Sequence, residues 1–127
     1  MIIKPIQKQI LLVDDDELCL KVLTQYLDEA QYSYITCKDG QRAWNYLQQH
    51  PNNFFVILSD RIMPHLHGLQ LLTKKQGLNI PLVLFSGVAS KEERCEAIAH
   101  GVYDFFYKPV SKELLLALLK KIKKQLL

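Results

Sequence analysis

Short apolar runs alternate along the chain with segments whose apolar residues recur every three or four positions. This alternation of strand and helix patterns predicts βαβ units around a parallel sheet. The expected strands are residues 10–13, 33–37, 54–59, 82–85 and 105–107. The third and fourth runs are apolar at successive positions, as in strands covered on both faces, so we expect them inside the sheet. The second run contains polar residues and is expected at an edge.

Five helices are expected between and after these strands, and most begin at a polar capping residue. The predicted N-caps are Asp16, Asp39, Ser90 and Ser111. Ser90 is followed three residues later by a glutamate, which is the spacing of a capping box, and this helix is expected to end at Gly101. A shorter helix after Gly68 is expected to end near Gly77.

Two of the helices carry apolar stripes that predict which face is buried. In the first helix the expected stripe is Leu18, Val22, Leu23, Tyr26, Leu27 and Ala30. In the last helix it is Leu115, Leu118, Leu119, Ile122 and Leu126. Crossovers between parallel strands are almost always right-handed, so few arrangements of these elements are left.

Four of the expected strands end on a charged or hydroxyl residue. These residues are Asp14 and Asp15 after the first strand, Asp60 after the third, Ser86 after the fourth and Lys108 after the fifth. The carboxyl ends of parallel strands meet at one edge of a sheet, where open α/β sheets bind their ligands. We therefore expect these five side chains to converge.

The charges at this edge indicate a cation. Three carboxylates at one site repel one another by about 1–4 kcal/mol per pair at about 4 Å. Lys108 balances one of the three charges, and the two that remain match one divalent ion. Oxygen ligands without a dedicated cage favour Mg²⁺. Zn²⁺ would prefer histidine or cysteine, and none stands at a strand end.

A carboxylate at such a site can also act as a nucleophile that takes up a phosphoryl group as an acyl phosphate. The cation and Lys108 would then neutralise charge, and the Ser86 hydroxyl would donate to a phosphoryl oxygen. Each residue alone has a simpler explanation, with Asp14 as a cap, Asp60 and Ser86 as turn residues and Lys108 as a solvated lysine. A phosphoryl-transfer site accounts for all of them together.

Composition limits the alternatives. The chain has 127 residues, 49% hydrophobic and 23% charged, which is ordinary for one globular domain. A net charge of +3 is too small to indicate nucleic acid or a membrane, and we expect contact with neither. The lysines near the C-terminus are interpreted as a solvated helix face. Three cysteines without CxxC spacing are interpreted as free thiols in a reducing cytoplasm.

Five motifs taken in order resemble the receiver domain of two-component response regulators. They are Asp14-Asp15, residues 60–64 (DRIMP) with Gly68, residues 85–87 (FSG), residues 101–105 (GVYDF) and Lys108-Pro109. Each motif is weak alone, but the ordered set is specific, and the resemblance extends from Gln9 into the last helix. It implies a doubly wound, flavodoxin-like α/β fold: a five-stranded parallel sheet in the order 2-1-3-4-5, flanked by five helices.

The resemblance also assigns roles to the strand-end residues. Asp60 would accept a phosphoryl group from a phosphohistidine of a histidine kinase or histidine phosphotransfer protein, in a Mg²⁺-dependent reaction. Asp15 would bind Mg²⁺ directly, Asp14 mostly through water, and the Ile62 backbone carbonyl would be a further ligand. Lys108 would pair with the phosphoryl group, and the bond from Lys108 to the following proline is expected to be cis.

In the family, the event is transmitted by a hydroxyl and an aromatic residue, here Ser86 and Phe105. Ser86 would move toward the phosphoryl group and Phe105 would swing inward. The surface of the fourth helix, fifth strand and fifth helix would change, and would serve a phosphorylation-dependent homodimer or an output partner. Phe105 lacks the phenolic hydroxyl of many relatives. Ile62 and Val88 stand where the family tunes hydrolysis, and their apolar side chains predict slow autodephosphorylation.

These observations predict a single cytoplasmic receiver domain over residues 1–127, with no effector domain and no catalysis beyond its own phosphorylation and dephosphorylation. A magnesium-dependent phosphatase would need a second acid near the nucleophile, where Arg61 and Ile62 stand. A flavodoxin-like cofactor module would need a phosphate-binding loop after the first strand, where the chain is acidic. A degenerate receiver that acts as a phosphorylation-independent interaction module is the main alternative. Whether the protein stands alone or forms part of a larger regulator is open.

Overall fold

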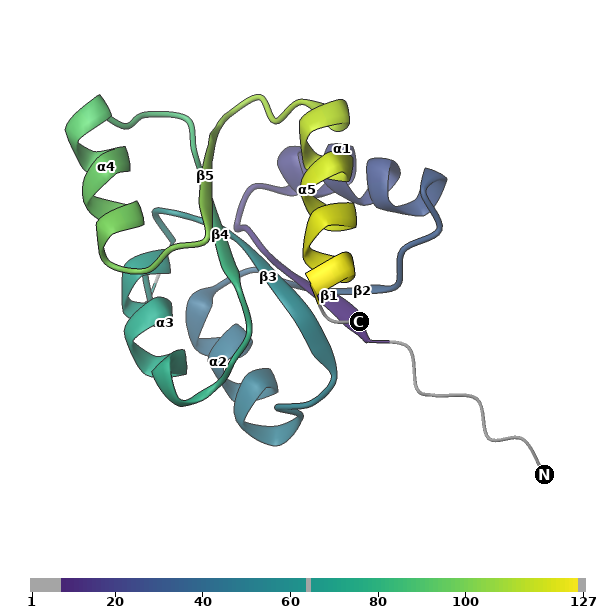
Figure 1. Ribbon diagram of the computed structural model, residues 1–127, viewed down its shortest axis with the longest axis horizontal. Helices are drawn as coiled ribbons and strands as arrows, with labels where there is room; N and C mark the ends of the chain where they lie inside the picture. The colour runs from purple at the N-terminus through teal and green to yellow at the C-terminus, as the bar shows by residue number, and fades with distance from the viewer. Residues whose placement is uncertain (1–7, 64, 126–127) are drawn as a thin grey trace.

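The fold is a five-stranded parallel sheet with helices on both faces (Figure 1), seen in a computed structural model that describes residues 8–63 and 65–125. The strands are β1 (Gln9–Val13), β2 (Tyr34–Cys37), β3 (Phe54–Asp60), β4 (Leu82–Ser86) and β5 (Asp104–Tyr107). The helices are α1 (Glu17–Glu29), α2 (Gly40–Gln49), α3 (Gly68–Lys74), α4 (Lys91–Ala99) and α5 (Lys112–Gln125), with a 3₁₀ turn η1 (Lys75–Gly77) after α3. The strand order β2-β1-β3-β4-β5 confirms the predicted topology.

The apolar runs explain which strands lie inside the sheet. In the three central strands nearly every side chain is buried on one face or the other, as the continuous apolar patterns of β3 and β4 predict. β2 is partly exposed and lies at one edge, as expected, and β5 forms the other edge. Each strand differs from its expected range by one residue at one end and agrees with it at the other.

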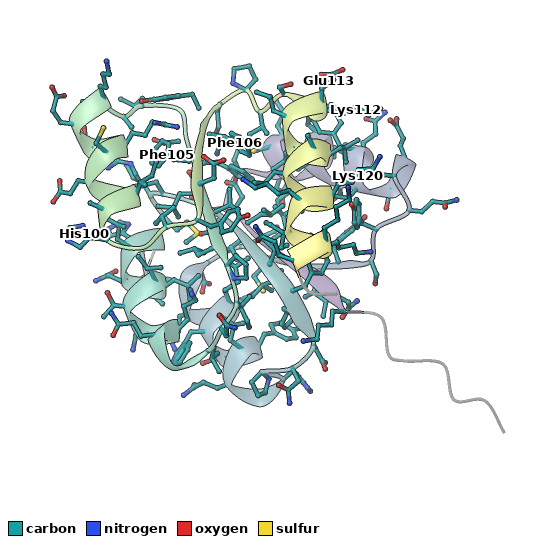
Figure 2. The ribbon with its side chains drawn as sticks, viewed as in Figure 1. His100, Phe105, Phe106, Lys112, Glu113 and Lys120 are labelled. Atoms are coloured by element: carbon teal, nitrogen blue, oxygen red, sulfur yellow. The ribbon has the colours of Figure 1, made fainter. Side chains whose placement is uncertain are left out.

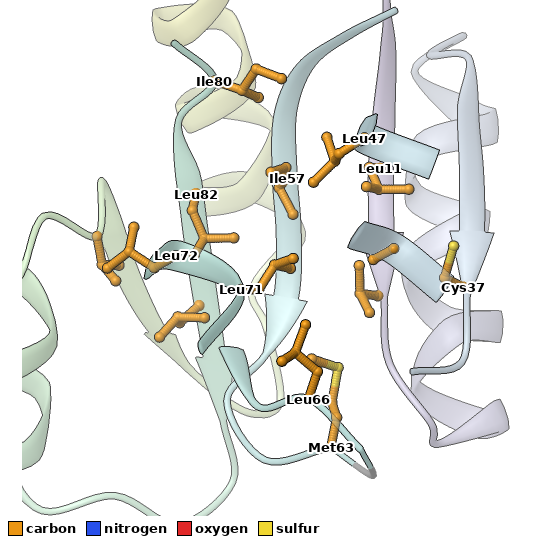
Figure 3. Close-up of a cluster of buried hydrophobic side chains, with 14 of the residues drawn as sticks. Leu11, Cys37, Leu47, Ile57, Met63, Leu66, Leu71, Leu72, Ile80 and Leu82 are labelled. Carbon is orange, nitrogen blue, oxygen red and sulfur yellow. The ribbon is translucent and has the colours of Figure 1, made fainter. Parts of the chain in front are cut away.

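Two hydrophobic clusters fill the space between the sheet and the helices. Leu11, Ile57 and Leu82 lie with residues of α2, α3 and α4 in one cluster (Figure 3). The alternate residues, among them Leu12 and Leu58, face α1 and α5 in the other. Because side chains of a strand point to alternate faces, each central strand contributes to both clusters.

The predicted caps are formed. Asp16 accepts from the backbone N–H groups of Leu18 and Cys19, and Asp39 accepts from that of Arg42. Ser90 and Glu93 form the capping box of α4. The Ser111 hydroxyl accepts from the N–H of Leu114 at 3.3 Å.

Helix α4 ends as its glycine predicts. Gly101 has a φ of 109°, a conformation that glycine adopts without strain. The N–H groups of Gly101 and Val102 donate to the carbonyls of Ile98 and Ala97, which is the hydrogen-bond pattern of a Schellman motif.

The stripe predicted for the first helix is partly wrong. Leu18 and Val22 are 70% and 40% exposed, whereas Leu20, which was left out of the stripe, is buried with Leu23 and Leu27. Leu18 and Val22 lie roughly 160–200° around the helix from Leu20, on its opposite side. The stripe of α5 is confirmed at its four described positions, and its fifth member, Leu126, lies outside the described residues, as does Pro64 of the DRIMP motif.

Within residues 8–63 and 65–125, none of the helices combines the length and the apolar character that crossing a membrane would require.

Candidate functional site

The sheet order places the two acidic strand ends side by side. β1 and β3 are neighbours, with Val13 opposite Ser59. Asp14 and Asp60 directly follow these two residues, so they lie side by side at the same edge of the sheet. Carboxylate oxygens of Asp14, Asp15 and Asp60 lie within 4.8 Å of one another. Asp14 is fully buried, Asp60 is half-buried and Asp15 is exposed, so the cluster opens toward solvent on one side.

Asp14 is held by two hydrogen bonds that use both of its oxygens. Oδ1 accepts from the backbone N–H of Asp16 at 2.9 Å, and Oδ2 accepts from Lys108 Nζ at 2.9 Å. The first bond connects the carboxylate to the N-cap of α1. The second supplies the positive charge that a buried carboxylate requires.

Lys108 bridges the two acidic strand ends. Its Nζ lies 2.9 Å from Asp14 Oδ2 and 3.5 Å from Asp60 Oδ1. Burial alone would lower the pKa of Lys108, but the hydrogen bond to Asp14 and the charges of Asp14 and Asp60 outweigh it and raise that pKa. The peptide bond to Pro109 is cis, as predicted, and the Lys108 N–H donates to the Ser86 carbonyl at 2.8 Å. The raised pKa keeps the Lys108 ammonium charged, and its contacts with Asp14 and Asp60 hold it beside the two carboxylates.

The surroundings of Asp60 disfavour its charged form, whereas those of Lys108 favour the charged form of the lysine. Burial raises the pKa of its carboxyl, the charge of Asp14 raises it further, and Lys108 only partly offsets both effects. The negative charge of Asp60 is thus less stable in the folded protein than in water. A group that adds positive charge at this edge would be favoured there.

Ser86 directly follows Phe85, the register partner of Asp60, but its hydroxyl is bonded away from the acidic cluster. Its hydroxyl donates to the Val88 carbonyl at 2.8 Å, and the same oxygen accepts from the Val88 N–H at 3.3 Å. The side chain is 2% exposed. Ser86 ends β4, as predicted, and these bonds direct its hydroxyl toward the loop between β4 and α4.

Cys19 also borders the cluster. Burial raises the pKa of its thiol to about 12, and the neighbouring Asp14 carboxylate adds to the effect. The thiol is therefore protonated at neutral pH and is not a nucleophile. All three cysteines are free, as expected.

Comparisons with known proteins identify the family of this chain and support its fold. Residues 10–120 match the family described as the response regulator receiver domain. The chain belongs to this family. Among solved structures, the receiver domain of the Francisella response regulator 1452 has a TM-score of 0.85 at 27% identity, covering 95% of this chain and 100% of that one.

Some relatives of this receiver chain are much longer proteins. Two-component response regulator ARR12 of Arabidopsis thaliana is 34% identical over 111 residues, which cover 86% of this chain but 18% of that protein. The 3',5'-cyclic-nucleotide phosphodiesterase regA of Dictyostelium discoideum is 33% identical over 116 residues, covering 87% of this chain and 15% of that protein. The chain therefore spans a small part of the length of these relatives.

Phe105 of this receiver is already directed inward. It is 2% exposed and packs in the cluster under α4, whereas Phe106 faces α5 (Figure 2). Tyr107, 44% exposed, lies edge-on to Phe105 with ring centroids 5.6 Å apart. Whether Phe105 moves on phosphorylation stays a prediction.

Two glycines permit close packing around the site. The sequence alone did not indicate these contacts. A Cβ at Gly68 would lie 2.6 Å from a Leu84 methyl carbon and 3.0 Å from the Asp60 carbonyl oxygen. A Cβ at Gly40 would lie 2.1 Å from the Leu66 carbonyl oxygen. The loop after β3 is thus pressed against β4 on one side and the start of α2 on the other. Only the motif position of Gly68 signalled it beforehand.

The histidines of this loop differ in role. His65 and His67 are both exposed. His67, however, is the N-cap of α3, and its Nδ1 accepts from the Met63 N–H at 3.3 Å. The ring of His67 therefore links the turn after Asp60 to the start of α3.

Sequence reasoning also missed Arg61. Its guanidinium contacts Glu93 at 2.6 Å and the Val88 carbonyl at 3.0 Å, and Nε lies 3.4 Å from the Ser86 hydroxyl. Its position directly after Asp60 is the one feature that pointed to it, since its partners are distant in the sequence.

Proposed function

We propose that this receiver accepts a phosphoryl group on Asp60 from a phosphohistidine of a histidine kinase or histidine phosphotransfer protein. The observation that carries the proposal is the arrangement of Asp60 beside Asp14 and Asp15, with the Lys108 ammonium 3.5 Å from Asp60. This set combines a nucleophile, ligands for a divalent cation and a fixed positive charge.

The residues present fit Mg²⁺. Three clustered carboxylates and one ammonium leave an excess of two negative charges, and burial and like charge disfavour the ionised form of Asp60. Asp14, Asp15, Asp60 and the Ile62 backbone carbonyl would hold the ion. When bound, Mg²⁺ neutralises charge on the carboxylates and on the phosphoryl oxygens.

In the transfer, an Asp60 carboxylate oxygen attacks the phosphorus. An O–P bond forms, the P–N bond to the donor imidazole breaks, and its electron pair returns to the ring nitrogen. The Lys108 ammonium stabilises the negative charge of the transferred group. The Ser86 hydroxyl, after leaving Val88, donates to a phosphoryl oxygen. Lys108 is suited to this role because its raised pKa keeps it protonated at neutral pH.

The surface next to the site favours a protein as phosphoryl donor. Leu18 and Val22 on α1 are exposed and lie with Pro109 along one apolar groove beside Lys108. Exposed apolar side chains at the rim of a polar site are typical of protein contacts. We propose that the phosphoryl donor docks on this groove. With such a donor, the protein would function in the cytoplasm.

Signal output and lifetime are part of the same proposal. Ile98, Tyr107 and Leu114 expose apolar surface on α4, β5 and α5, where a homodimer or an output partner would bind. Ile62 and Val88 are 56% and 82% exposed and offer no side-chain hydrogen bond to an attacking water. We expect the acyl phosphate to hydrolyse slowly, and a half-life as short as that of fast chemotaxis receivers would refute this.

Incubation with acetyl phosphate and Mg²⁺ tests the function. We expect intact-mass spectrometry to show one added phosphoryl group in the unmutated protein and none in Asp60→Asn or in the presence of EDTA. Beryllofluoride should bind the unmutated protein and not Asp60→Asn. If the unmutated protein is neither modified nor bound, the phosphorylation-independent interaction module becomes the better interpretation.

A further inference from the structure

Arg61 follows the proposed acceptor directly, yet its side chain extends away from the acidic cluster. Nη1 pairs with Glu93 Oε2 at 2.6 Å and Nη2 donates to the Val88 carbonyl at 3.0 Å. Its backbone is fixed as well, since its N–H donates to the Phe85 carbonyl at 2.7 Å and its carbonyl accepts from Gly68 at 3.0 Å. With a side chain only 19% exposed, Arg61 is held at both ends.

The acidic partner of Arg61 belongs to the first turn of α4. Oε1 of Glu93 accepts from the Ser90 N–H at 3.2 Å, while the Glu93 N–H donates to the Ser90 hydroxyl at 3.0 Å. One carboxylate therefore completes the capping box and binds Arg61 at the same time. The start of α4 is tied through this carboxylate to the residue next to Asp60.

The same guanidinium is connected to Ser86. The Ser86 oxygen accepts from Arg61 Nε at 3.4 Å and donates to the Val88 carbonyl at 2.8 Å. Ser86 and Arg61 therefore share the Val88 carbonyl as acceptor. For Ser86 to donate to a phosphoryl group on Asp60, it must give up Val88, and the Arg61–Glu93 pair holds the loop where that bond is made.

We propose that Arg61 is a positioning residue that, through Glu93, holds the Ser86 hydroxyl against Val88 and so opposes its engagement with a phosphorylated Asp60. This inference rests on the proposed function. It makes the Arg61–Glu93 pair the link between the acceptor and α4. Phe105 is less suited to that role, because it is already buried under α4 and has no hydroxyl that could change hydrogen-bond partners.

Two substitutions release the link while keeping local structure. Arg61→Met retains the length of the side chain and removes its charge. Glu93→Gln keeps a capping-box residue, since glutamine also serves at this position, and removes the charge that binds Arg61. With saturating Mg²⁺, we expect each variant to bind beryllofluoride about three- to tenfold more tightly, because Ser86 is freed. Mg²⁺ affinity without beryllofluoride should change by less than about twofold.

The pair of variants separates this proposal from a simple electrostatic effect. Beryllofluoride with fluoride ligands is an anion, so loss of the Arg61 charge would weaken its binding and loss of the Glu93 charge would strengthen it. The proposal requires a gain in both variants and no further gain in the double variant, because both remove one link. Opposite signs, additive gains or equal changes in Mg²⁺ affinity would overturn it.

Matched controls lie close by. Glu92→Gln removes a negative charge from the same helical turn, and Arg42→Met removes a guanidinium that pairs with Asp39 at the start of α2. Both should leave beryllofluoride affinity unchanged within about twofold. A gain in either control as large as in Arg61→Met would refute the assignment to the Arg61–Glu93 pair.

Hydrogen exchange in the unmodified protein tests the link independently of phosphorylation. We expect amides of residues 88–93 to exchange faster in Arg61→Met and Glu93→Gln, and at the unmutated rate in the controls. If the unmutated protein binds no beryllofluoride, the proposed function fails, and the exchange rates still decide whether Arg61 holds this segment. Unchanged exchange in both variants would overturn the inference.

Discussion

Lys108 is the cation that allows two carboxylates to lie side by side at the ends of β1 and β3. Asp14 is fully buried, so its charge has no compensation from water and depends on the Lys108 ammonium at 2.9 Å. Removing one partner of a buried ion pair costs more than the pair itself contributes, because the remaining charge is left in a poorly solvated place.

Lys108→Met should therefore lower the free energy of unfolding by about 2 kcal/mol at pH 7 in EDTA, measured by urea denaturation. Saturating Mg²⁺ should recover much of this loss, because the ion replaces the missing positive charge. Lys112→Met is the control, since Lys112 pairs with Glu29 on the surface and exposed pairs contribute about 1 kcal/mol or less. Equal losses in the two variants would contradict this role of Lys108.

Gly68 gives a second test at the residue scale. Gly68→Ala places a methyl group 2.6 Å from a Leu84 carbon and 3.0 Å from the Asp60 carbonyl, so the loop or β4 must shift. We expect a loss of about 1–3 kcal/mol in urea denaturation. Gly77→Ala, at a position with no atom within 4 Å of the added carbon, should change stability by less than about 1 kcal/mol. A Gly68→Ala variant as stable as Gly77→Ala would refute the close packing.

The site residues fall into two groups by how well the sequence predicts them. Asp14, Asp60 and Lys108 could be predicted because a strand end fixes position with little help from the rest of the fold. The Arg61–Glu93 contact could not, since it depends on where α4 lies relative to the end of β3. A hydrogen bond such as that from Ser86 to Val88 depends on the loop conformation, which no periodicity encodes.

At the scale of elements, helix α1 shows where periodicity gives an ambiguous answer. Its apolar residues span roughly 200° of the helix circumference, so two overlapping stripes fit the spacing rule. Packing against the sheet and α5 selects the stripe of Leu20, Leu23 and Leu27. The interior strands and the caps were predictable because continuous apolar runs and cap side chains act locally, whereas the strand order came from the resemblance to receiver domains.

Alanine substitutions in α1 check the observed packing. Leu27→Ala removes a fully buried side chain and should cost about 3 kcal/mol in urea denaturation. Leu18→Ala should cost less than about 0.5 kcal/mol, because its side chain is 70% exposed. Comparable losses at the two positions would mean that the helix is rotated as the sequence pattern alone predicted.

At the scale of the whole molecule, the acidic edge lowers the stability of the fold at neutral pH. Burial and the charge of Asp14 raise the pKa of Asp60, so the folded chain binds a proton at this group more tightly than the unfolded chain does. Its favourable contribution is therefore complete below the ordinary value of 3.8 and is lost as the pH rises through the higher folded-state pKa. At neutral pH the ionised Asp60 destabilises the fold, even with Lys108 3.5 Å away.

Asp60→Asn should accordingly be more stable than the unmutated protein at pH 7 in EDTA, by about 1 kcal/mol for a like-charge pair near the surface. The difference should shrink as the pH is lowered toward the ordinary value of 3.8, because the raised pKa means that the unmutated carboxyl takes up its proton above that value. Urea denaturation at the two pH values measures both effects. Mg²⁺ should reverse the order at pH 7, since an ion at 100 times its Kd adds about 2.7 kcal/mol to a protein that binds it only when folded. An Asp60→Asn variant that is less stable than the unmutated protein in EDTA would show that ionised Asp60 does not destabilise the fold. A variant that gains as much stability from Mg²⁺ as the unmutated protein would show that Asp60 is not a ligand of the ion.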